Sequence, residues 1–508
     1  MKIWGEQIMK KHVKEILILL ISAVLITLPL WNRQLYLLTW PGLIAGMAVF
    51  HRTKKLRGAF IKGWFWGGIL ALCFSYWLFH PIRNFSGLPL PMVLFLLVVL
   101  FAAAGIFYAM WASAYKILNP GDEFSVLIAA FTWVSFEFLR AIFFPYFPFG
   151  FIGLTQTGFD TLLQLAEIGG VFLISFITIL LSGLLYKFLL SKRFLYLLLV
   201  LIIFLSSSFY TSSLINERRE FWQENSRNFE AGIIMTGIDQ EEKWEEENIE
   251  KNLKRVADKI ESAFAKEADI VFTPETSLTF DYLRNEYYRD KFYDNLNPMG
   301  YFMVGSQSSG DDPAETLNSY FLIDEYKNIQ GRYNKNDLIP GEVIPLAGVA
   351  EFFTGREWHS LTRGEEQEFM SFEASHEDDF SFRVLTCSEI LYASDDYSRL
   401  NEVDMLVNPS NEAWFGDTNL QSQMWESARL RAVELRVPVF KSGNKAYSGY
   451  IEPDGEDRAV DDKYTTIDAA AGRASAEKTI YQRLGDYPGY ISLVMMLIVI
   501  PGIRLYQA

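Results

Sequence analysis

Long stretches without a charged residue are the feature that most constrains this chain of 508 residues. A helix needs about 20 mostly apolar residues to cross the roughly 30 Å of hydrocarbon in a bilayer. Seven charge-free stretches are of about this length, and an eighth is interrupted only by Glu137 and Arg140. We therefore expect eight transmembrane helices, at 16–32, 34–50, 63–82, 84–115, 124–143, 168–186, 194–216 and 487–503.

The charge of the chain is unevenly divided. Residues 213–490 carry 54 Asp and Glu against 29 Lys and Arg, whereas the remaining residues carry 7 against 17. A strongly acidic part repels phosphates, which excludes a nucleic-acid-binding surface. We expect a membrane domain at 1–216, an acidic domain outside the membrane at 217–485, and a final transmembrane helix at 486–508.

Lysines and arginines indicate the orientation of these spans. If the N-terminus is cytoplasmic, the cytoplasmic connections hold twelve of them and the connections on the other side hold three. Because positive residues favour the cytoplasmic side, both termini are predicted to be cytoplasmic and 217–485 to lie outside. The first span has a lysine-rich flank, as a signal peptide has, but Trp31-Asn32-Arg33 follows in place of a cleavage site, which predicts an uncleaved span.

Glu137 and Arg140 stand three residues apart near the outer end of the fifth predicted span. We interpret them as a local ion pair that reduces the cost of two charges near lipid. The functional alternative is a contact with a polar lipid headgroup.

The acidic domain has the pattern of an α/β fold. Residues 245–265 are highly charged with apolar residues at helical spacing, which predicts a surface helix. Short apolar segments that alternate with helical stretches favour an α/β domain. The expected strands are 229–235, 269–273, 301–305, 318–323, 382–386, 404–408 and 437–441.

Reactive side chains follow the predicted strands. Glu275 and Cys387 stand directly after two of them, and Lys335 lies in a polar segment further along the chain. Functional sites of open α/β sheets gather at the carboxyl ends of strands. A thiol is mostly protonated at neutral pH, but a carboxylate can take its proton and an ammonium group can stabilise the oxyanion that follows. The alternative for Cys387 is a small buried apolar side chain.

Cysteine and histidine counts limit other chemistry. Cys73 and Cys387 are the only cysteines, and the five histidines show no metal-ligand spacing. A disulfide framework and a zinc site are therefore excluded, and we expect neither a metal nor a cofactor.

These motifs resemble a known family. The segments Thr273–Glu275, Tyr333–Asn336 and Cys387–Glu389 resemble the Glu-Lys-Cys triad of the nitrilase, or carbon–nitrogen hydrolase, superfamily. Within it, essentially the whole chain resembles the bacterial apolipoprotein N-acyltransferases, whose layout is also seven spans, an outer domain and one final span. Further matching segments are Gln240–Trp244, Gly341–Leu346, Asn408–Asp417, Arg429–Glu434, and, in the membrane part, Trp133, Glu137, Arg140 and 144–150.

The resemblance implies an αββα sandwich at 217–485 and a two-step acyl transfer on the periplasmic face of the bacterial inner membrane. Cys387 would take a fatty acyl chain from a phospholipid as a thioester. It would then pass the chain to the α-amine of the N-terminal diacylglyceryl-cysteine of a lipoprotein. The family roles carry over as Glu275 for the general base and Lys335 for stabilising the tetrahedral intermediate. The implied supporting or substrate-binding residues are Trp244, Glu342, Ser388 and Glu389.

The chain departs from the family pattern at several positions. Ser388 replaces the usual aromatic residue after the nucleophile, Met235 and Gly237 replace Gln and Asn, and Met424 replaces His. All three triad members remain, so these departures concern the shape of the substrate pocket.

Other functions compete with this one. The main alternative is a membrane-tethered nitrilase-type amidase that uses the same triad on a small amide, although one span would suffice for a tether. A transporter should show polar residues at the midplane of its spans, which are nearly free of charge here. A Cys–His enzyme would use His359 or His376.

We also expect the segment 346–372 to cover the site and to touch the membrane.

Overall fold

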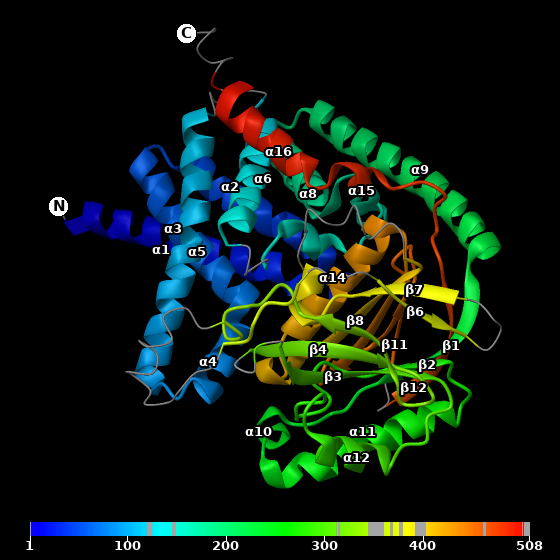
Figure 1. Ribbon diagram of the computed structural model, residues 1–508. Helices are drawn as coiled ribbons and strands as arrows, with labels where there is room; N and C mark the ends of the chain where they lie inside the picture. Colours follow the sequence, from blue (N-terminus) through cyan, green and yellow to red (C-terminus); the bar gives the residue numbers. More distant parts are fainter. Residues whose placement is uncertain are drawn as a thin grey trace. The chain divides into compact units, whose positions relative to one another are not determined.

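The computed structural model describes residues 2–118, 124–144, 149–310, 312, 315–343, 360–365, 369–374, 379–391, 403–460, 464–499 and 501. Contacts within the chain define two compact units, and Figure 1 shows the elements of both. The first unit consists of Met1–Phe79, Pro89–Ile215 and Arg483–Ala508. The second consists of His80–Leu88 and Asn216–Gln482.

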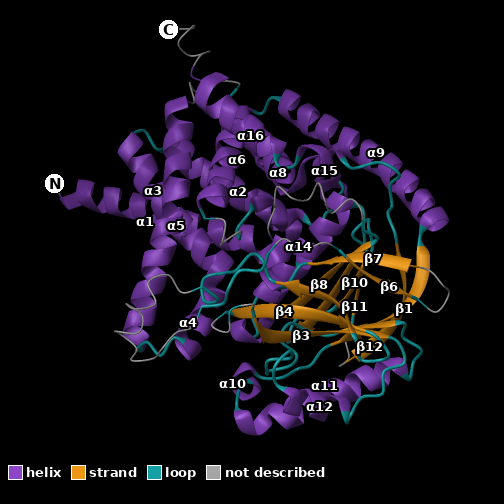
Figure 2. Ribbon diagram, viewed as in Figure 1, coloured by secondary structure: helices purple, strands orange, loops and turns teal. Residues whose placement is uncertain are grey.

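The described part of the first unit is helical (Figure 2). Its long helices are rich in apolar residues and also contain Ser, Thr and Gly, whose small side chains allow helices to pack closely. The helices are α1 (Lys2–Thr27), α2 (Thr39–Arg52), α3 (Leu56–Ser75), α5 (Leu90–Leu118), α6 (Ser125–Phe143), α7 (Asp160–Leu163), α8 (Ala166–Ser191), α9 (Phe194–Asn225) and α16 (Tyr487–Val494), with α4 (Phe79–Phe85) at the boundary with the second unit.

Six helical segments among the described residues are long and apolar enough to cross a membrane: Lys10–Leu30, Leu56–Phe85, Leu90–Leu118, Ser125–Phe143, Ala166–Ser191 and Phe194–Asn225. They correspond to six of the predicted spans. The other two predicted spans contain shorter helices. In the stretch 34–50, a 3-10 helix at Arg33–Leu38 precedes α2, and near the C-terminus the apolar helix is Tyr487–Ile498.

The two charges of α6 bind the chain that follows this helix. Glu137 Oε1 accepts hydrogen bonds from Trp133 Nε1 and from the backbone N–H of Ile152, both at 2.8 Å. Arg140 donates to the backbone carbonyls of residues 149 and 150, at 2.5 and 2.9 Å. The two side chains attract each other electrostatically, as predicted, but in the described part of the chain their hydrogen bonds go to other groups, mainly backbone groups of the segment that follows α6.

The second unit is built on two six-stranded sheets. In the first sheet the strand order is β12-β1-β2-β3-β4-β5, with β1 (Arg227–Ile234), β2 (Ile270–Phe272), β3 (Tyr301–Ser309), β4 (Thr316–Ile323), β5 (Ile329–Asn334) and β12 (Tyr464–Ala471). In the second it is β11-β10-β9-β8-β7-β6, with β6 (Met370–Glu373), β7 (Asp379–Val384), β8 (Met405–Asn411), β9 (Val439–Asn444), β10 (Gly449–Ile451) and β11 (Asp457–Ala459). The seven predicted strands are confirmed as parts of β1, β2, β3, β4, β7, β8 and β9.

The hydrophobic core lies between the sheets, and helices cover their outer faces. Alternate residues of a strand point to opposite faces, so Ile270 and Phe272 join the core between the sheets while Val271 packs with α11 (Ile249–Phe264). Helices α11 and α12 (Glu286–Tyr293) lie along the first sheet, and α14 (Leu420–Leu435) contacts β9 and β10 of the second (Figure 1). The predicted surface helix at 245–265 is α11. This is an αββα sandwich.

Strand directions bring distant residues to one edge. Strands β1, β2 and β3 are parallel, and β4 is antiparallel to both β3 and β5, so β2 and β5 run in the same direction. In the second sheet β7, β8 and β9 are parallel. Residues that follow β2 and β5 therefore lie at the same edge of the first sheet.

Candidate active site

Glu275 follows β2 in a tight turn. Its side chain is buried and its carboxylate has three partners: Asn318 Nδ2 donates to Oε1 at 2.7 Å, the backbone N–H of Asn411 donates to Oε2 at 3.0 Å, and Lys335 Nζ lies 3.4 Å from Oε1. These donors come from β4, β8 and the segment after β5. Three donors from three parts of the domain therefore hold this buried carboxylate in a fixed position, as a general base requires.

Lys335 directly follows β5 and is 1% exposed. Its ammonium group contacts Glu342 Oε1 at 2.7 Å as well as Glu275. Burial alone would lower the pKa of Lys335, but the carboxylates of Glu342 and Glu275 outweigh it and raise that pKa well above the ordinary value. Burial raises the pKa of Glu342, against the attraction of Lys335. The site therefore places the Lys335 ammonium group between two acidic side chains that favour its charged form.

Cys387 lies in a turn after β7 and begins a 3-10 helix at Cys387–Leu391. Its φ of 51° is in the left-handed region, which is strained for a residue with a side chain and occurs often at active sites. Burial and the charge of Glu275 raise the pKa of its thiol, while Lys335 opposes the rise. The thiol is therefore protonated at neutral pH, and it needs a base when it attacks.

Glu389 connects two parts of the site. Oε1 of its buried carboxylate accepts from the backbone N–H groups of Asn336 and Asp337 at 2.8 and 3.0 Å, and Oε2 accepts from that of Thr386 at 2.6 Å. The hydroxyl of Tyr333 donates to both oxygens at 2.8 Å. One side chain thus joins the segment that follows Lys335 to the residue before Cys387. Burial raises the pKa of Glu389 to about 7, against the effects of Lys335 and the hydrogen bonds.

The two other predicted residues have different surroundings. The Ser388 hydroxyl is buried and has no hydrogen-bond partner in the described part of the chain. Trp244 ends α10 (Gln240–Lys243), is 39% exposed, and shares no hydrogen bond with the triad among the described residues. Most of the predicted covering segment 346–372, and also His359 and His376, lie outside the described residues.

Two residues that support Glu275 were not predicted from the sequence. Asn318, at the start of β4, donates to the Glu275 carboxylate, and its backbone carbonyl accepts from the N–H of Lys335 at 2.8 Å. Lys243 is 1% exposed, and its Nζ donates to the Glu275 carbonyl at 3.3 Å and to Thr276 Oγ1 at 2.8 Å. Burial lowers the pKa of Lys243 to about 7. In the sequence, Asn318 could be recognised only as a polar residue near the end of a predicted strand. Its proximity to Glu275 depends on the order of the strands in the sheet.

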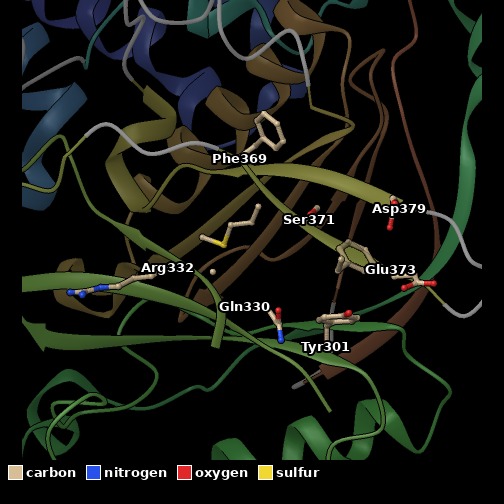
Figure 3. Close-up of a pocket in the computed structure, with 10 residues that line it drawn as sticks. Tyr301, Gln330, Arg332, Phe369, Ser371, Glu373 and Asp379 are labelled. Atoms are coloured by element: carbon tan, nitrogen blue, oxygen red, sulfur yellow. The ribbon is translucent and has the colours of Figure 1, made fainter. Parts of the chain in front are cut away.

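A separate cavity of about 500 Å³ opens between the edge strands β5 and β6 (Figure 3). The residues that line it include Tyr301, Gln330, Glu373 and Asp379, and none of the predicted site residues lines it.

Among the described residues, no group of three or more His, Cys, Asp or Glu side chains is arranged to hold a metal ion. The candidate catalytic centre is the charged cluster around Lys335, because its ammonium group contacts Glu275 and Glu342 there.

The chemistry of this cluster is nucleophilic. It combines a thiol on a strained turn, a buried carboxylate that can accept a proton, and a buried cation near that carboxylate. Such a set is suited to covalent acyl transfer, in which a carbonyl carbon is attacked and its oxygen becomes negative.

The αββα sandwich with its Glu, Lys and Cys at the strand ends defines a carbon–nitrogen hydrolase domain, and the family model described as carbon–nitrogen hydrolase matches residues 235–481. A second family model, described as the apolipoprotein N-acyltransferase N-terminal domain, matches residues 22–184. The chain belongs to the apolipoprotein N-acyltransferases, which are membrane proteins of the nitrilase superfamily.

Relatives match over nearly the full chain. The apolipoprotein N-acyltransferase of Geobacter metallireducens is 24% identical, over 93% of this chain and 92% of its own. That of Haemophilus influenzae is 26% identical, over 90% and 88%. Among solved structures, the nitrilase-superfamily protein Nit3 of Saccharomyces cerevisiae is 14% identical with a TM-score of 0.34, covering 48% of this chain and 90% of its own.

Proposed function

We propose that this chain is an N-acyltransferase that moves a fatty acyl chain from a membrane phospholipid, through a thioester on Cys387, to the α-amine of the N-terminal diacylglyceryl-cysteine of lipoproteins. The observation that carries the proposal is the buried contact of Lys335 with Glu275, 3.4 Å apart, at the strand ends of a carbon–nitrogen hydrolase domain. The family, whose curated relatives carry this activity in their names, supplies the substrate class.

In the first half-reaction Glu275 takes the proton of the Cys387 thiol while the sulfur attacks the ester carbonyl of the phospholipid. The C–S bond forms, and the carbonyl oxygen becomes an oxyanion that the Lys335 ammonium stabilises. The ester C–O bond then breaks, and the lysophospholipid leaves with the proton that Glu275 held. Because the thiol is protonated at rest, proton transfer and attack occur together.

In the second half-reaction the neutral α-amine of the acceptor attacks the thioester carbonyl. Glu275 takes a proton from the nitrogen, Lys335 again stabilises the oxyanion, and the C–S bond breaks as the proton returns to the sulfur. The products are an amide on the lipoprotein and the free thiol. Splitting the transfer into two steps lets the two lipid substrates use one site in turn.

The supporting residues have distinct proposed roles. Glu342 holds Lys335 at 2.7 Å, and Glu389 fixes the two backbone segments that carry Lys335 and Cys387. The Ser388 hydroxyl, which has no hydrogen-bond partner among the described residues, and the exposed Trp244 are proposed to contact substrate.

We also propose the membrane arrangement predicted from the sequence. It has seven spans within 1–216, a catalytic domain at 217–485 in the periplasm, and an eighth span within 486–508, in the bacterial inner membrane with both termini cytoplasmic. The charge bias of the connections supports this orientation. In the part of the chain that the structure describes, six of these spans have helices of sufficient length.

The test is incubation of the purified chain with phospholipid alone, followed by intact-mass analysis. We expect one added acyl chain that maps to Cys387, is released by hydroxylamine, and transfers to a diacylglyceryl-cysteine peptide. Cys387→Ala should neither load nor transfer, and Cys73→Ala serves as the matched control because Cys73 lies within α3. Acylation of a Ser or Lys would refute the mechanism. Release of ammonia from small amides without lipid would favour an amidase instead.

A further inference from the structure

A second buried lysine, Lys441, lies behind the turn that carries Cys387. The turn needs support, because a residue with a side chain is strained at the φ of 51° that Cys387 adopts. Part of that support comes from Asn408 in β8. Its Nδ2 donates to the backbone carbonyl of Cys387 at 3.1 Å and also to that of Leu385.

The orientation of the Asn408 amide is set by its other end. Oδ1 accepts from Lys441 Nζ at 3.2 Å, and the register of β8 and β9 places Asn408 directly beside Lys441. If the amide were turned over, its NH₂ group would face the ammonium group and its oxygen would face two carbonyls. All three contacts would then be repulsive, so the lysine fixes the direction in which Asn408 donates.

The ammonium group of Lys441 has no capacity left for substrate. It is fully buried and has three donors, and the second and third of these bind Ser410 Oγ at 2.6 Å and Glu412 Oε1 at 2.7 Å. Asn408 and Ser410 alternate along β8 and so share one face, and Glu412 begins the 3-10 helix that directly follows β8. The charge of Lys441 is balanced by Glu412, whose side chain is also fully buried. Among the described residues, Asn408 is therefore the side chain that links Lys441 to the Cys387 turn by hydrogen bonds.

We propose that Lys441 is a positioning residue for the nucleophile: it orients the Asn408 amide, which in turn holds the left-handed turn of Cys387. The inference rests on the proposed function only in taking Cys387 as the reactive thiol. The contact with Asn408, rather than the charge of Lys441, is what the turn requires.

The experiment measures the rate at which iodoacetamide alkylates Cys387 in the purified full chain, without lipid. A Cys73→Ala background leaves Cys387 as the sole thiol. Asn408→Asp keeps the shape and the contact with Lys441 but cannot donate to the two carbonyls. The double variant Lys441→Met with Glu412→Gln removes the lysine without leaving a buried charge unpaired.

We expect each of these changes to slow alkylation by about tenfold, and the combination to slow it no further, because both act through one hydrogen-bonded unit. Lys441→Gln with Glu412→Gln retains a donor for Asn408 and should keep the rate within about threefold of the parent chain. The matched control is Arg429→Met with Glu426→Gln, which removes another buried pair, 2.7 Å apart, and should leave the rate unchanged.

A parent-like rate in the Lys441→Met double variant, or additive losses on combination with Asn408→Asp, would overturn the proposal. If the Lys441→Met double variant shows no thermal unfolding transition, the test rests on Asn408→Asp. A parent-like alkylation rate in Asn408→Asp would then show that Asn408 does not hold the Cys387 turn, and would overturn the proposal. The proposed function fails in a different way: Cys387 would then load no acyl chain from phospholipid, whatever its alkylation rate.

Discussion

Replacing Tyr333 with Phe removes one hydroxyl group and tests how the site depends on pH. The hydroxyl donates to both carboxylate oxygens of Glu389 at 2.8 Å, and burial together with Glu389 keeps the pKa of Tyr333 well above its ordinary value. Protonation of Glu389 would turn one of its acceptor oxygens into an O–H group and weaken the hydrogen bonds that it accepts from Thr386, next to Cys387, or from Asn336 and Asp337. We therefore expect acyl loading in the parent chain to fall as the pH drops through about 7, where Glu389 takes up a proton.

The size of the effect follows from the lost hydrogen bond. A hydrogen bond to a charged group contributes about 1.5–3 kcal/mol, and about 1.4 kcal/mol corresponds to one pH unit. Removing the Tyr333 hydroxyl should therefore raise the pKa of Glu389 by about 1–2 pH units. The acid limb of the loading rate should move upward by the same amount, so that a variant nearly as active as the parent at pH 10 is strongly impaired at pH 7.5.

The assay is the initial rate of acyl-thioester formation on Cys387 between pH 5 and 10, followed by intact mass. Tyr450→Phe is the matched control, because that buried hydroxyl donates to the carbonyl of Ala470 and not to the site. The folded-state pKa of Glu389 lies above its unfolded value, so its contribution to stability is complete below about pH 4.5 and is lost as the pH rises through about 7. This group therefore does not cause acid unfolding in the range measured. An acid limb at the same pH in Tyr333→Phe and the parent would refute the reasoning.

Three further outcomes are expected. Asn318→Leu removes a 2.7 Å hydrogen bond to Glu275 and should slow acyl loading by about 10- to 100-fold in a chain that still folds, as measured by intact mass and thermal unfolding; an unchanged rate would contradict the assigned contact. The lowered pKa of Lys243 means that the parent should gain stability between pH about 7 and 10.5, and denaturant titrations of Lys243→Met should lack this gain. An impermeant amine label applied to spheroplasts should miss Lys10 and Lys11; their modification from outside would refute the proposed orientation.

The sequence predicted the strands of this domain well where they are apolar. β2 is an unbroken apolar segment followed by Glu275, and β7 alternates before Cys387, so both patterns were clear. β5 begins with two exposed residues and β11 is short and polar, so neither has the alternation that marks a half-buried strand. Edge strands of this kind are recognised only once their neighbours are known.

The residues of the site were predicted, but their contacts were not. Glu275, Lys335 and Cys387 follow from motifs, whereas Asn318 reaches Glu275 only because β4 pairs between β3 and β5. Glu389 could be placed near the nucleophile, but its hydrogen bonds to backbone groups 52 and 53 residues away depend on the three-dimensional fold. The catalytic roles of these residues stay predictions until the variants are measured.

In the membrane part, apolar composition was a reliable guide to where helices occur and a weaker guide to their length. The stretch 34–50 is as free of charge as its neighbours, yet Asn32 accepts a hydrogen bond from the backbone N–H of Gln34 and begins a 3-10 helix, so that α2 has only 14 residues. A hydropathy pattern counts apolar residues, and a local hydrogen bond of this kind leaves no trace in it.

The left-handed turn at Cys387 has a consequence for making stable forms of this protein. Glycine adopts a φ of 51° without strain, whereas alanine keeps the clash of Cβ with the backbone. Cys387→Gly should thus melt at a higher temperature than Cys387→Ala, although neither can form a thioester. For capturing both lipid substrates in an inert enzyme, the glycine variant is the better starting material.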